Sequence, residues 1–434
     1  MAVRLKRRDP GFAEGFAKLL DAKRESAADV DRDVADILAR VRSEGDAALI
    51  ALTRQFDNLE LTADTLAIPS TDMEAAEAAC PAEALKALDS AAERIEAYHA
   101  RQMPKDEAFT DSAGVRLGWR WRPIQAAGVY VPGGRASYPS SVLMNVIPAR
   151  IAGVRRIVMV VPAPGGEINP LVLAAARRAG VSEAYRVGGA QAVGALAYGT
   201  ETIAPVDKIV GPGNAWVAAA KRQVFGTVGI DMVAGPSEIL VVADAANDPD
   251  WIAIDLLSQA EHDSAAQSIL ITDDEAFASQ VEKAVESRLK TLPRASIAGE
   301  SWAANGAVII VDDLSDAPEL VDAIAPEHLE LAVAEPGLLA DAVTNAGAIF
   351  LGRFTPEAVG DYVAGANHVL PTSRTARFSS GLSVLDFVKR TSIVGCDADA
   401  LGVIGPAAVT LAEAEGLDAH ALSIAIRLNL PSSS

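Results

Sequence analysis

The chain has little of several things that particular protein classes require. Only two of its 434 residues are cysteines, which excludes a disulfide framework and a cysteine-based zinc module. Aromatic residues make up 5% although half of the residues are hydrophobic, which disfavours an aromatic stacking platform for nucleic acid. Positive charge is also scarce, because 38 Lys and Arg against 58 Asp and Glu leave a net charge of −20. That charge repels phosphate backbones and anionic lipid surfaces, so we expect neither nucleic acid nor membrane as a partner.

No segment has the composition of a targeting or membrane-spanning sequence. Lys6, Arg7 and Arg8 form a short basic start, but Asp9-Pro10-Gly11 follow where a signal peptide has an apolar run of about 7–15 residues. Apolar runs such as 157–161 end in proline, glycine or charge, well short of the roughly 18 residues of a membrane span. We therefore expect a cytoplasmic protein.

The succession of periodic segments predicts an α/β protein. Apolar residues recur at three- and four-residue spacing in 30–41 and 85–98, which predicts amphipathic helices. Short apolar runs that alternate with helical segments predict buried parallel strands. These runs are 128–131, 156–161, 185–187 and 208–210, and after Ser237 they are 239–242, 268–272, 307–311, 329–333 and 348–351. We expect two successive α/β blocks with mainly parallel sheets, a helical N-terminal region and a short helical tail at 407–427.

Two glycine-rich turns lie between a predicted strand and a predicted helix. In the turn at 188–194, Gln191 occupies the place of the middle glycine of a dinucleotide-binding fingerprint, so the strict motif fails. The second turn, Gly211-Pro212-Gly213-Asn214, precedes a helix whose first N–H groups are free to meet an anion. Glycine is also common in strand-to-helix turns without any ligand, and the turns alone leave both interpretations open.

The five histidines are His99, His262, His328, His368 and His420, and four of them lie in polar segments. Gln259 and His262 share one helix face if the helix of 251–257 continues, which suits zinc ligation or an ordinary polar helix end. Glu327-His328 precedes a predicted strand and offers a carboxylate and an imidazole for acid–base work, or simply polar residues before a strand. The remaining candidates are Asp361 and His368 in a glycine-containing loop, and Glu415 and His420 in the tail. Together such groups form an N/O metal site of the zinc or manganese type.

The cysteines disfavour one route of aldehyde oxidation. That route needs a thiolate nucleophile in electropositive surroundings. Cys80 lies in an Ala/Glu-rich helical segment, and Cys396 adjoins Asp397. Any aldehyde oxidation by this chain would therefore use water activated by a metal or a carboxylate.

Seven short strings occur in an order that resembles one enzyme family. They are Gly-Pro-Gly-Asn (211–214), Ala-Gly-Pro-Ser-Glu (234–238), Gln-Ala-Glu-His-Asp (259–263), Pro-Glu-His-Leu (326–329), Gly-Asp-Tyr (360–362), Asn-His-Val-Leu-Pro-Thr (367–372) and Glu-Gly-Leu-Asp-Ala-His (415–420). In this order they closely resemble the histidinol dehydrogenases, over nearly the whole chain. The resemblance implies four-electron oxidation of L-histidinol through L-histidinal to L-histidine with two NAD⁺, in homodimers with one zinc ion per subunit and shared active sites.

The resemblance also implies a role for each candidate residue. Glu327 and His328 would be the catalytic acid–base pair. The implied zinc ligands are Gln259, His262, Asp361 and, from the other chain's tail, His420. Those ligands and His328, together with Ser237, His368 and Glu415, would contact the substrate. Tyr130, Gln191 and Asn214 would contact NAD⁺.

By the same resemblance, the fold is two Rossmann-like α/β domains with a helical N-terminal region and a helical C-terminal dimerisation tail. The expected division is an N-terminal helical arm (1–26), a discontinuous larger α/β domain with the metal and acid–base residues (27–129 and 239–380), a second α/β domain with the NAD contacts (130–238), and a tail that crosses to the partner subunit (381–434). Three other functions remain as alternatives. They are oxidation of another primary alcohol such as a sulfonated diol, zinc-dependent hydrolysis with Glu327 as base, and a non-catalytic metal-binding scaffold.

Overall fold

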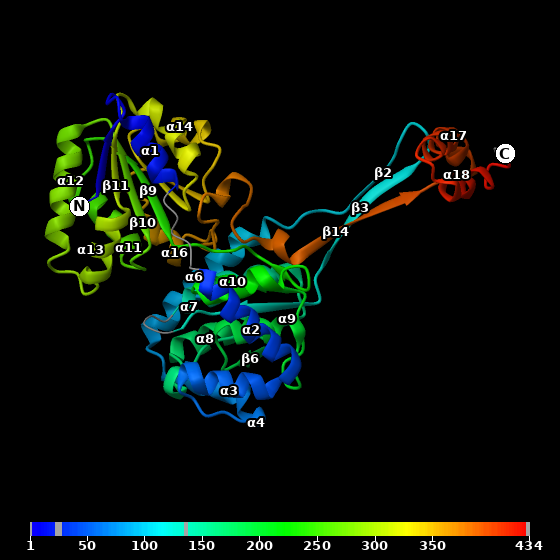
Figure 1. Cartoon of the computed structure of the whole chain (residues 1–434), viewed down its shortest axis with the longest axis horizontal. Helices are drawn as coiled ribbons and strands as arrows, with labels where there is room; N and C mark the ends of the chain where they lie inside the picture. The colour runs from blue at the N-terminus through cyan, green and yellow to red at the C-terminus, as the bar shows by residue number, and fades with distance from the viewer. Residues whose placement is uncertain (1, 22–27, 134–137, 431–434) are drawn as a thin grey trace. The chain divides into compact units, whose positions relative to one another are not determined.

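The computed structural model describes residues 2–21, 28–133 and 138–430 (Figure 1). The chain divides into two compact units. Unit 1 comprises Met1–Gln102 and Gln125–Phe387, and unit 2 comprises Met103–Ile124 and Val388–Ser434. Within the described residues, no helix combines the length and the apolar character that crossing a membrane requires.

A six-stranded parallel sheet forms one part of unit 1. Its strand order is β1 (Val3–Lys6), β11 (Ala307–Ile310), β10 (Gln267–Thr272), β9 (Glu238–Ala243), β12 (His328–Ala332) and β13 (Ala348–Leu351). Strands β9, β10 and β12 are buried along their whole length because helices cover both faces. One face packs against α11 (Pro249–Ala260), α12 (Glu275–Arg288) and α13 (Ala295–Asn305). The other packs against α1 (Phe12–Asp21), α14 (Ala317–Ile324) and α15 (Pro336–Ala342).

A five-stranded parallel sheet forms the other part of unit 1. Its order is β6 (Glu183–Tyr185), β5 (Arg156–Val160), β4 (Ala126–Tyr130), β7 (Lys208–Val210) and β8 (Gly229–Ile230). One hydrophobic core contains residues of α2 (Ala28–Glu44), α3 (Asp46–Asp57), α9 (Gly189–Tyr198) and α10 (Ala215–Val224). The remaining helices of this part are α4 (Ala63–Leu66), α5 (Ser70–Ala79), α6 (Ala82–Ala100), α7 (Pro139–Ala152) and α8 (Pro170–Ala179).

The strand order of this second sheet reverses beside β4. From β4 the chain builds β5 and β6 on one side and then crosses to add β7 on the other. In open parallel sheets, ligands bind outside the carboxyl ends of the strands at such a reversal. The loops after β4 and β7 are therefore the expected position of a ligand in this sheet.

Unit 2 is a small antiparallel sheet with two helices. Strand β3 (Arg116–Pro123) pairs with β2 (Glu107–Thr110) on one side and with β14 (Val388–Gly395) on the other. Helices α17 (Ala398–Ala414) and α18 (Asp418–Ala425) follow and pack against each other. Their buried residues are alanine and glycine, whereas Val403, Leu411 and Ile426 are 65%, 64% and 65% exposed. Unit 2 thus leaves large apolar side chains uncovered, which is unusual unless a partner packs on them.

The mainly parallel α/β fold and all nine predicted strands are confirmed, and so are the helices of the tail. The structure differs from the expected division in three places. Val3–Lys6 is a strand of the six-stranded sheet where a helical arm was expected. Helices α2 and α3 pack with the five-stranded sheet rather than with 239–380. The segments of β2 and β3 were expected to belong to the larger α/β domain (27–129). Instead, β3 pairs with β2 and with the tail strand β14, which the helical prediction missed.

The differences at β1 and at β2, β3 and β14 have one physical cause. Short strands at the edge of a sheet or in a ribbon acquire their pairing from distant segments, and their own sequence carries little hydrophobic periodicity. The expected boundary between 26 and 27 lies outside the described residues. The expected assignment of the two sheets to two separate domains stays a prediction.

Candidate active site

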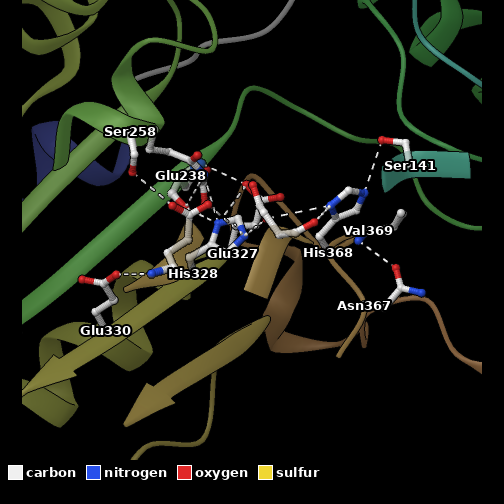
Figure 2. Close-up of polar contacts among 12 residues, drawn as sticks. Ser141, Glu238, Ser258, Glu327, His328, Glu330, Asn367, His368 and Val369 are labelled. Atoms are coloured by element: carbon white, nitrogen blue, oxygen red, sulfur yellow. Dashed lines mark hydrogen bonds and ion pairs between the residues drawn. The ribbon is translucent and has the colours of Figure 1, made fainter. Parts of the chain in front are cut away.

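The acid–base candidates lie where two neighbouring strands of the six-stranded sheet begin. Glu327 directly precedes β12, and His328 is its first residue. His328 is paired in register with Ile239 of β9, so Ser237 and Glu238 lie at the same edge of the sheet. Figure 2 shows Glu238, Glu327 and His328 grouped there. Parallel pairing thus brings two segments that are about 90 residues apart in the chain into contact.

Glu327 is a buried carboxyl held by a single backbone donor. Its Oε2 accepts a hydrogen bond from the Glu238 N–H at 2.9 Å. Burial raises the pKa of Glu327 well above its usual value, and the nearby carboxylates of Glu238, Asp361 and Glu357 add to the rise. A carboxyl with a raised pKa is suited to accept a proton during a reaction.

His328 directs an unpartnered nitrogen toward two carboxylates. Its Nδ1 lies 3.0 Å from the Glu238 carbonyl oxygen, which can only accept, so we assign the ring proton to Nδ1. Among the described residues, its buried Nε2 has no hydrogen-bond partner, and it lies 3.8 Å from Asp361 Oδ1 and 3.9 Å from Glu357 Oε1. Burial lowers the pKa of His328. The imidazole is therefore neutral near pH 7, with Nε2 available as a proton acceptor.

One group of side chains has the composition of a metal site. Nε2 of His328 and the carboxylates of Glu357 and Asp361 lie within 4.8 Å of one another. The two carboxylates are four residues apart on α16 (Glu357–Tyr362) and therefore share a face of that helix. Burial raises the pKa of Glu357 to about 9, and the charges of Asp361 and Glu330 contribute. A divalent cation would relieve the mutual repulsion of these buried carboxylates.

Gln259 completes the polar lining of this group. It lies in the last turn of α11, and its Nε2 donates to the Glu238 carbonyl oxygen at 3.3 Å, the same oxygen that accepts from His328 Nδ1. Its amide oxygen, Oε1, is buried and has no hydrogen-bond partner within the described ranges. A buried amide oxygen without a donor fits a cation as its partner, so this side chain and the nearby carboxylates suit a divalent metal ion.

The loop after α16 connects this site to the five-stranded part of unit 1. His368 Nδ1 donates to the Asp361 carbonyl oxygen at 3.0 Å, and its Nε2 lies 3.3 Å from Ser141 Oγ on α7. Figure 2 shows Ser141 and His368 facing each other. Asn367 Nδ2 donates to the Met144 carbonyl oxygen at 2.7 Å and lies 3.3 Å from Nε2 of the buried His99. The buried His99 therefore has a structural role.

The three NAD candidates lie together at the carboxyl edge of the five-stranded sheet. Tyr130 ends β4, and its hydroxyl accepts a hydrogen bond from the Gly189 N–H at 3.0 Å. Gln191 is buried in the first turn of α9, and its Oε1 would lie 2.6 Å from a Cβ placed on Gly189. Asn214 follows β7 and caps α10, where its Oδ1 accepts from the N–H groups of Trp216 and Val217 at 3.1 Å. These loops flank the strand-order reversal at β4.

Not every predicted residue belongs to these contacts. His262 is exposed, two residues after α11 ends, although it is close enough to lower the pKa of His328 and His368. Ser237 is partly buried directly before β9. Glu415 and His420 belong to unit 2, where both are exposed, whereas every contact described above lies within unit 1.

Three residues of this group, Ser141, Glu238 and Glu357, were not predicted from the sequence. The sequence does contain a signal for Glu357, because it precedes Asp361 by one helical turn and so shares its face. Glu238 and Ser141 enter the site through strand pairing and packing between distant segments, which no local pattern reveals.

Comparison with known proteins identifies close relatives along the whole chain. The family model described as "Histidinol dehydrogenase" matches residues 20–428. Histidinol dehydrogenase of Rhodospirillum rubrum is 67% identical over 430 residues, covering 99% of both chains. That of Rhizobium meliloti is 64% identical over 430 residues, again covering 99% of both. The crystal structure of histidinol dehydrogenase from Elizabethkingia anophelis has a TM-score of 0.94 and 38% identity, and the match covers 99% of this chain and 98% of that one.

Proposed function

Because the chain belongs to the histidinol dehydrogenase family, we propose that it oxidises L-histidinol through L-histidinal to L-histidine with two NAD⁺. It would act as a cytoplasmic enzyme in the final steps of histidine biosynthesis. One observation carries the proposal. The buried pair Glu327–His328 offers two proton acceptors, one with a raised and one with a lowered pKa, beside a group of side chains that suits a metal ion.

His328 is the base of the first oxidation. The alcohol O–H gives its proton to Nε2 while hydride leaves the carbinol carbon for NAD⁺, which produces histidinal and NADH. Two features favour this role. The carbonyl oxygen of Glu238 keeps the ring proton on Nδ1, and burial lowers the pKa so that the ring is neutral before the reaction.

Glu327 is the base of the second oxidation. It takes a proton from the water that attacks the aldehyde carbon. The resulting hydrate anion loses a second hydride to a second NAD⁺ to give the carboxylic acid, which then releases its proton to solvent and becomes the carboxylate. Its orientation is set by the hydrogen bond from the Glu238 N–H. The nucleophile is water because the sequence surroundings of the two cysteines do not favour a thiolate. Cys80 Sγ donates to the Ala76 carbonyl oxygen, and Cys396 is an exposed residue of unit 2.

The zinc ligands would be Gln259, His262 and Asp361 of one subunit and His420 of the partner subunit, with one zinc ion per subunit. When bound, zinc would orient the imidazole and amine of the substrate. The unpartnered Oε1 of Gln259 and the crowded carboxylates support a cation here. The exposed apolar side chains of α17 and α18 support a homodimer in which unit 2 packs on a second copy.

The remaining candidate residues form two groups, one that would bind the substrate and one that would bind NAD⁺. Ser237, His368 and Glu415 would line the substrate pocket, with Glu415 pairing with the substrate ammonium group. Tyr130, Gln191 and Asn214 would contact NAD⁺. Their position beside the strand-order reversal at β4 supports this assignment.

The test is oxidation of L-histidinol by the purified protein with Zn²⁺ and NAD⁺, followed by NADH absorbance. We expect two NADH per histidinol and loss of activity after chelation, with recovery when Zn²⁺ is restored. Absence of NADH, or equal rates with unrelated primary alcohols such as a sulfonated diol, would refute the substrate assignment.

A further inference from the structure

A buried lysine–aspartate pair lies outside the acid–base site and has no role in the mechanism above. Lys221 is in α10, and Asp231 directly follows β8. Their side chains are 2% and 1% exposed, and Lys221 Nζ contacts Asp231 Oδ1 directly. The free-energy cost of removing two charges from water is about as large as the attraction that they gain. Such a pair therefore adds little stability compared with apolar side chains of similar size. The other contacts of Lys221 and Asp231 therefore indicate the role of the pair.

Those contacts hold both backbone polar groups of one residue, Gly211. The Gly211 N–H donates to Asp231 Oδ2 at 2.8 Å, and its carbonyl oxygen accepts from Lys221 Nζ at 2.9 Å. Asp231 Oδ1 is itself oriented by the Met232 N–H at 2.6 Å. The two charged side chains thus form a clamp, by which we mean Lys221, Asp231 and their bonds to Gly211.

The clamped residue begins the turn that leads to Asn214. Gly211 has φ +110°, a conformation that L side chains rarely adopt, and a Cβ there would lie 2.2 Å from the Tyr130 carbonyl oxygen. The turn is therefore pressed against the end of β4, where Tyr130 receives the Gly189 N–H. Lys221 lies seven residues beyond Asn214 on the helix that Asn214 caps, so the clamp ties that helix back to its own first turn.

We propose that Lys221 and Asp231 are positioning residues that hold the Gly211–Asn214 turn, and with it Asn214 and Tyr130, in the arrangement that binds NAD⁺. This inference rests on the proposed function, because it requires that NAD⁺ bind at this edge of the sheet. Apolar side chains could fill the same volume, but they could not hold the Gly211 N–H and carbonyl oxygen. Loss of the clamp should therefore weaken nucleotide binding more than it affects the histidinol site.

The principal variant is the double substitution Lys221→Met/Asp231→Leu, which removes the clamp without leaving one buried charge unpaired. Lys208→Met/Asp386→Leu is the matched control, because Lys208 begins β7 at the opposite edge of the same sheet and pairs with Asp386 at 2.8 Å. The measurements are the NADH Kd by fluorescence titration, and the KM for NAD⁺ and for L-histidinol in the zinc-loaded full-length enzyme.

We expect the clamp variant to raise the NADH Kd and the KM for NAD⁺ by about tenfold or more, since a misplacement of about 1 Å is enough for such a loss. The KM for histidinol should change by less than about twofold, and the control should match the wild type in all three. An unchanged Kd in the folded clamp variant would overturn the inference. Wild-type protein that binds no NADH would contradict the proposed function instead.

A second variant keeps the inference testable if the double variant does not fold. Asp231→Asn retains the size of the side chain and an oxygen for the Gly211 N–H, but it weakens the attraction to Lys221. We expect an increase of roughly threefold to tenfold in the NADH Kd, again without a matching change in the KM for histidinol. Equal increases in both constants, or no change in either, would refute a positioning role.

Discussion

Replacing Glu327 by glutamine separates the two oxidations. The substitution keeps the shape of the side chain, and an amide oxygen can still accept the Glu238 N–H that Glu327 Oε2 accepts at 2.9 Å. Burial raises the pKa of Glu327 well above its usual value, so a neutral amide avoids the cost of burying a carboxylate. We therefore expect Glu327→Gln to fold with a Tm equal to or above that of the wild type.

The catalytic loss should fall on the second step. A glutamine amide cannot take the proton from the attacking water, and a positioned general base contributes about 10²–10⁴-fold. At roughly 1.4 kcal/mol per factor of ten, that is about 3–5 kcal/mol of barrier in aldehyde oxidation. In the proposed mechanism the first step uses Nε2 of His328, which makes no hydrogen bond to Glu327, so this step should slow by less than about tenfold.

Rapid-mixing measurements of NADH absorbance distinguish the steps. Started from histidinol, the variant should release about one NADH per site quickly and the second slowly, with histidinal accumulating to a level that an aldehyde trap can capture. Started from histidinal, it should show only the slow phase. Equal slowing from both substrates would refute the assignment of Glu327 as the base that activates water.

Three further predictions concern proton transfer, pH and subunit sharing. His328→Asn should slow the first oxidation by about 10²-fold or more while NADH binding is retained; an unchanged rate from histidinol would contradict its role as base. Burial raises the pKa of Glu330 well above 4.5, with the charge of Asp255 contributing, so the folded state binds that proton more tightly. The stability that the protonated Glu330 side chain contributes is fully present at pH values below the pKa of that group in the unfolded chain. It is lost as the pH rises through the pKa of that group in the folded protein. Glu330→Gln should therefore raise the Tm by a few degrees at pH 8 and much less at pH 4.5, as measured by thermal unfolding. An equal increase in Tm at both pH values would count against the burial argument. Mixing His328→Ala chains with His420→Ala chains should restore up to about a quarter of the wild-type activity per site, because one pocket of each heterodimer then receives both native groups. If subunit exchange is confirmed and no activity returns, a site that uses His420 of the partner subunit is excluded.

Several features of the fold were accessible from local patterns. Strands such as β9 and β10 are apolar on both faces and are bounded by turn residues, so their own residues predict burial in a parallel sheet. The exceptions are strands whose partners lie far away in the chain. Strand β1 pairs with β11 across about 300 residues, and β3 pairs with β14 across about 270. Hydrophobic periodicity reports burial, but it does not report which segment provides the partner.

The candidate site likewise combines residues that the sequence predicted with contacts that it did not predict. The residue types and strings at 259–263, 326–329 and 360–362 predicted acid–base and metal chemistry, and the structure groups Gln259, His328 and Asp361. The involvement of Glu238 in that group was not predictable, because its backbone N–H and carbonyl oxygen reach Glu327 and His328 only through the pairing of β9 with β12.

The amino-acid sequence by itself determined the fold class and the family and supplied the candidate site residues, because each is recorded in local patterns or in ordered strings. The tertiary structure alone decided the protonation preferences of Glu327, His328 and Glu357, since these follow from burial and from charges supplied by distant segments. It also decided that Lys221 and Asp231 meet at Gly211. Proximity between residues far apart in a chain is a property of packing, and no stretch of sequence contains it.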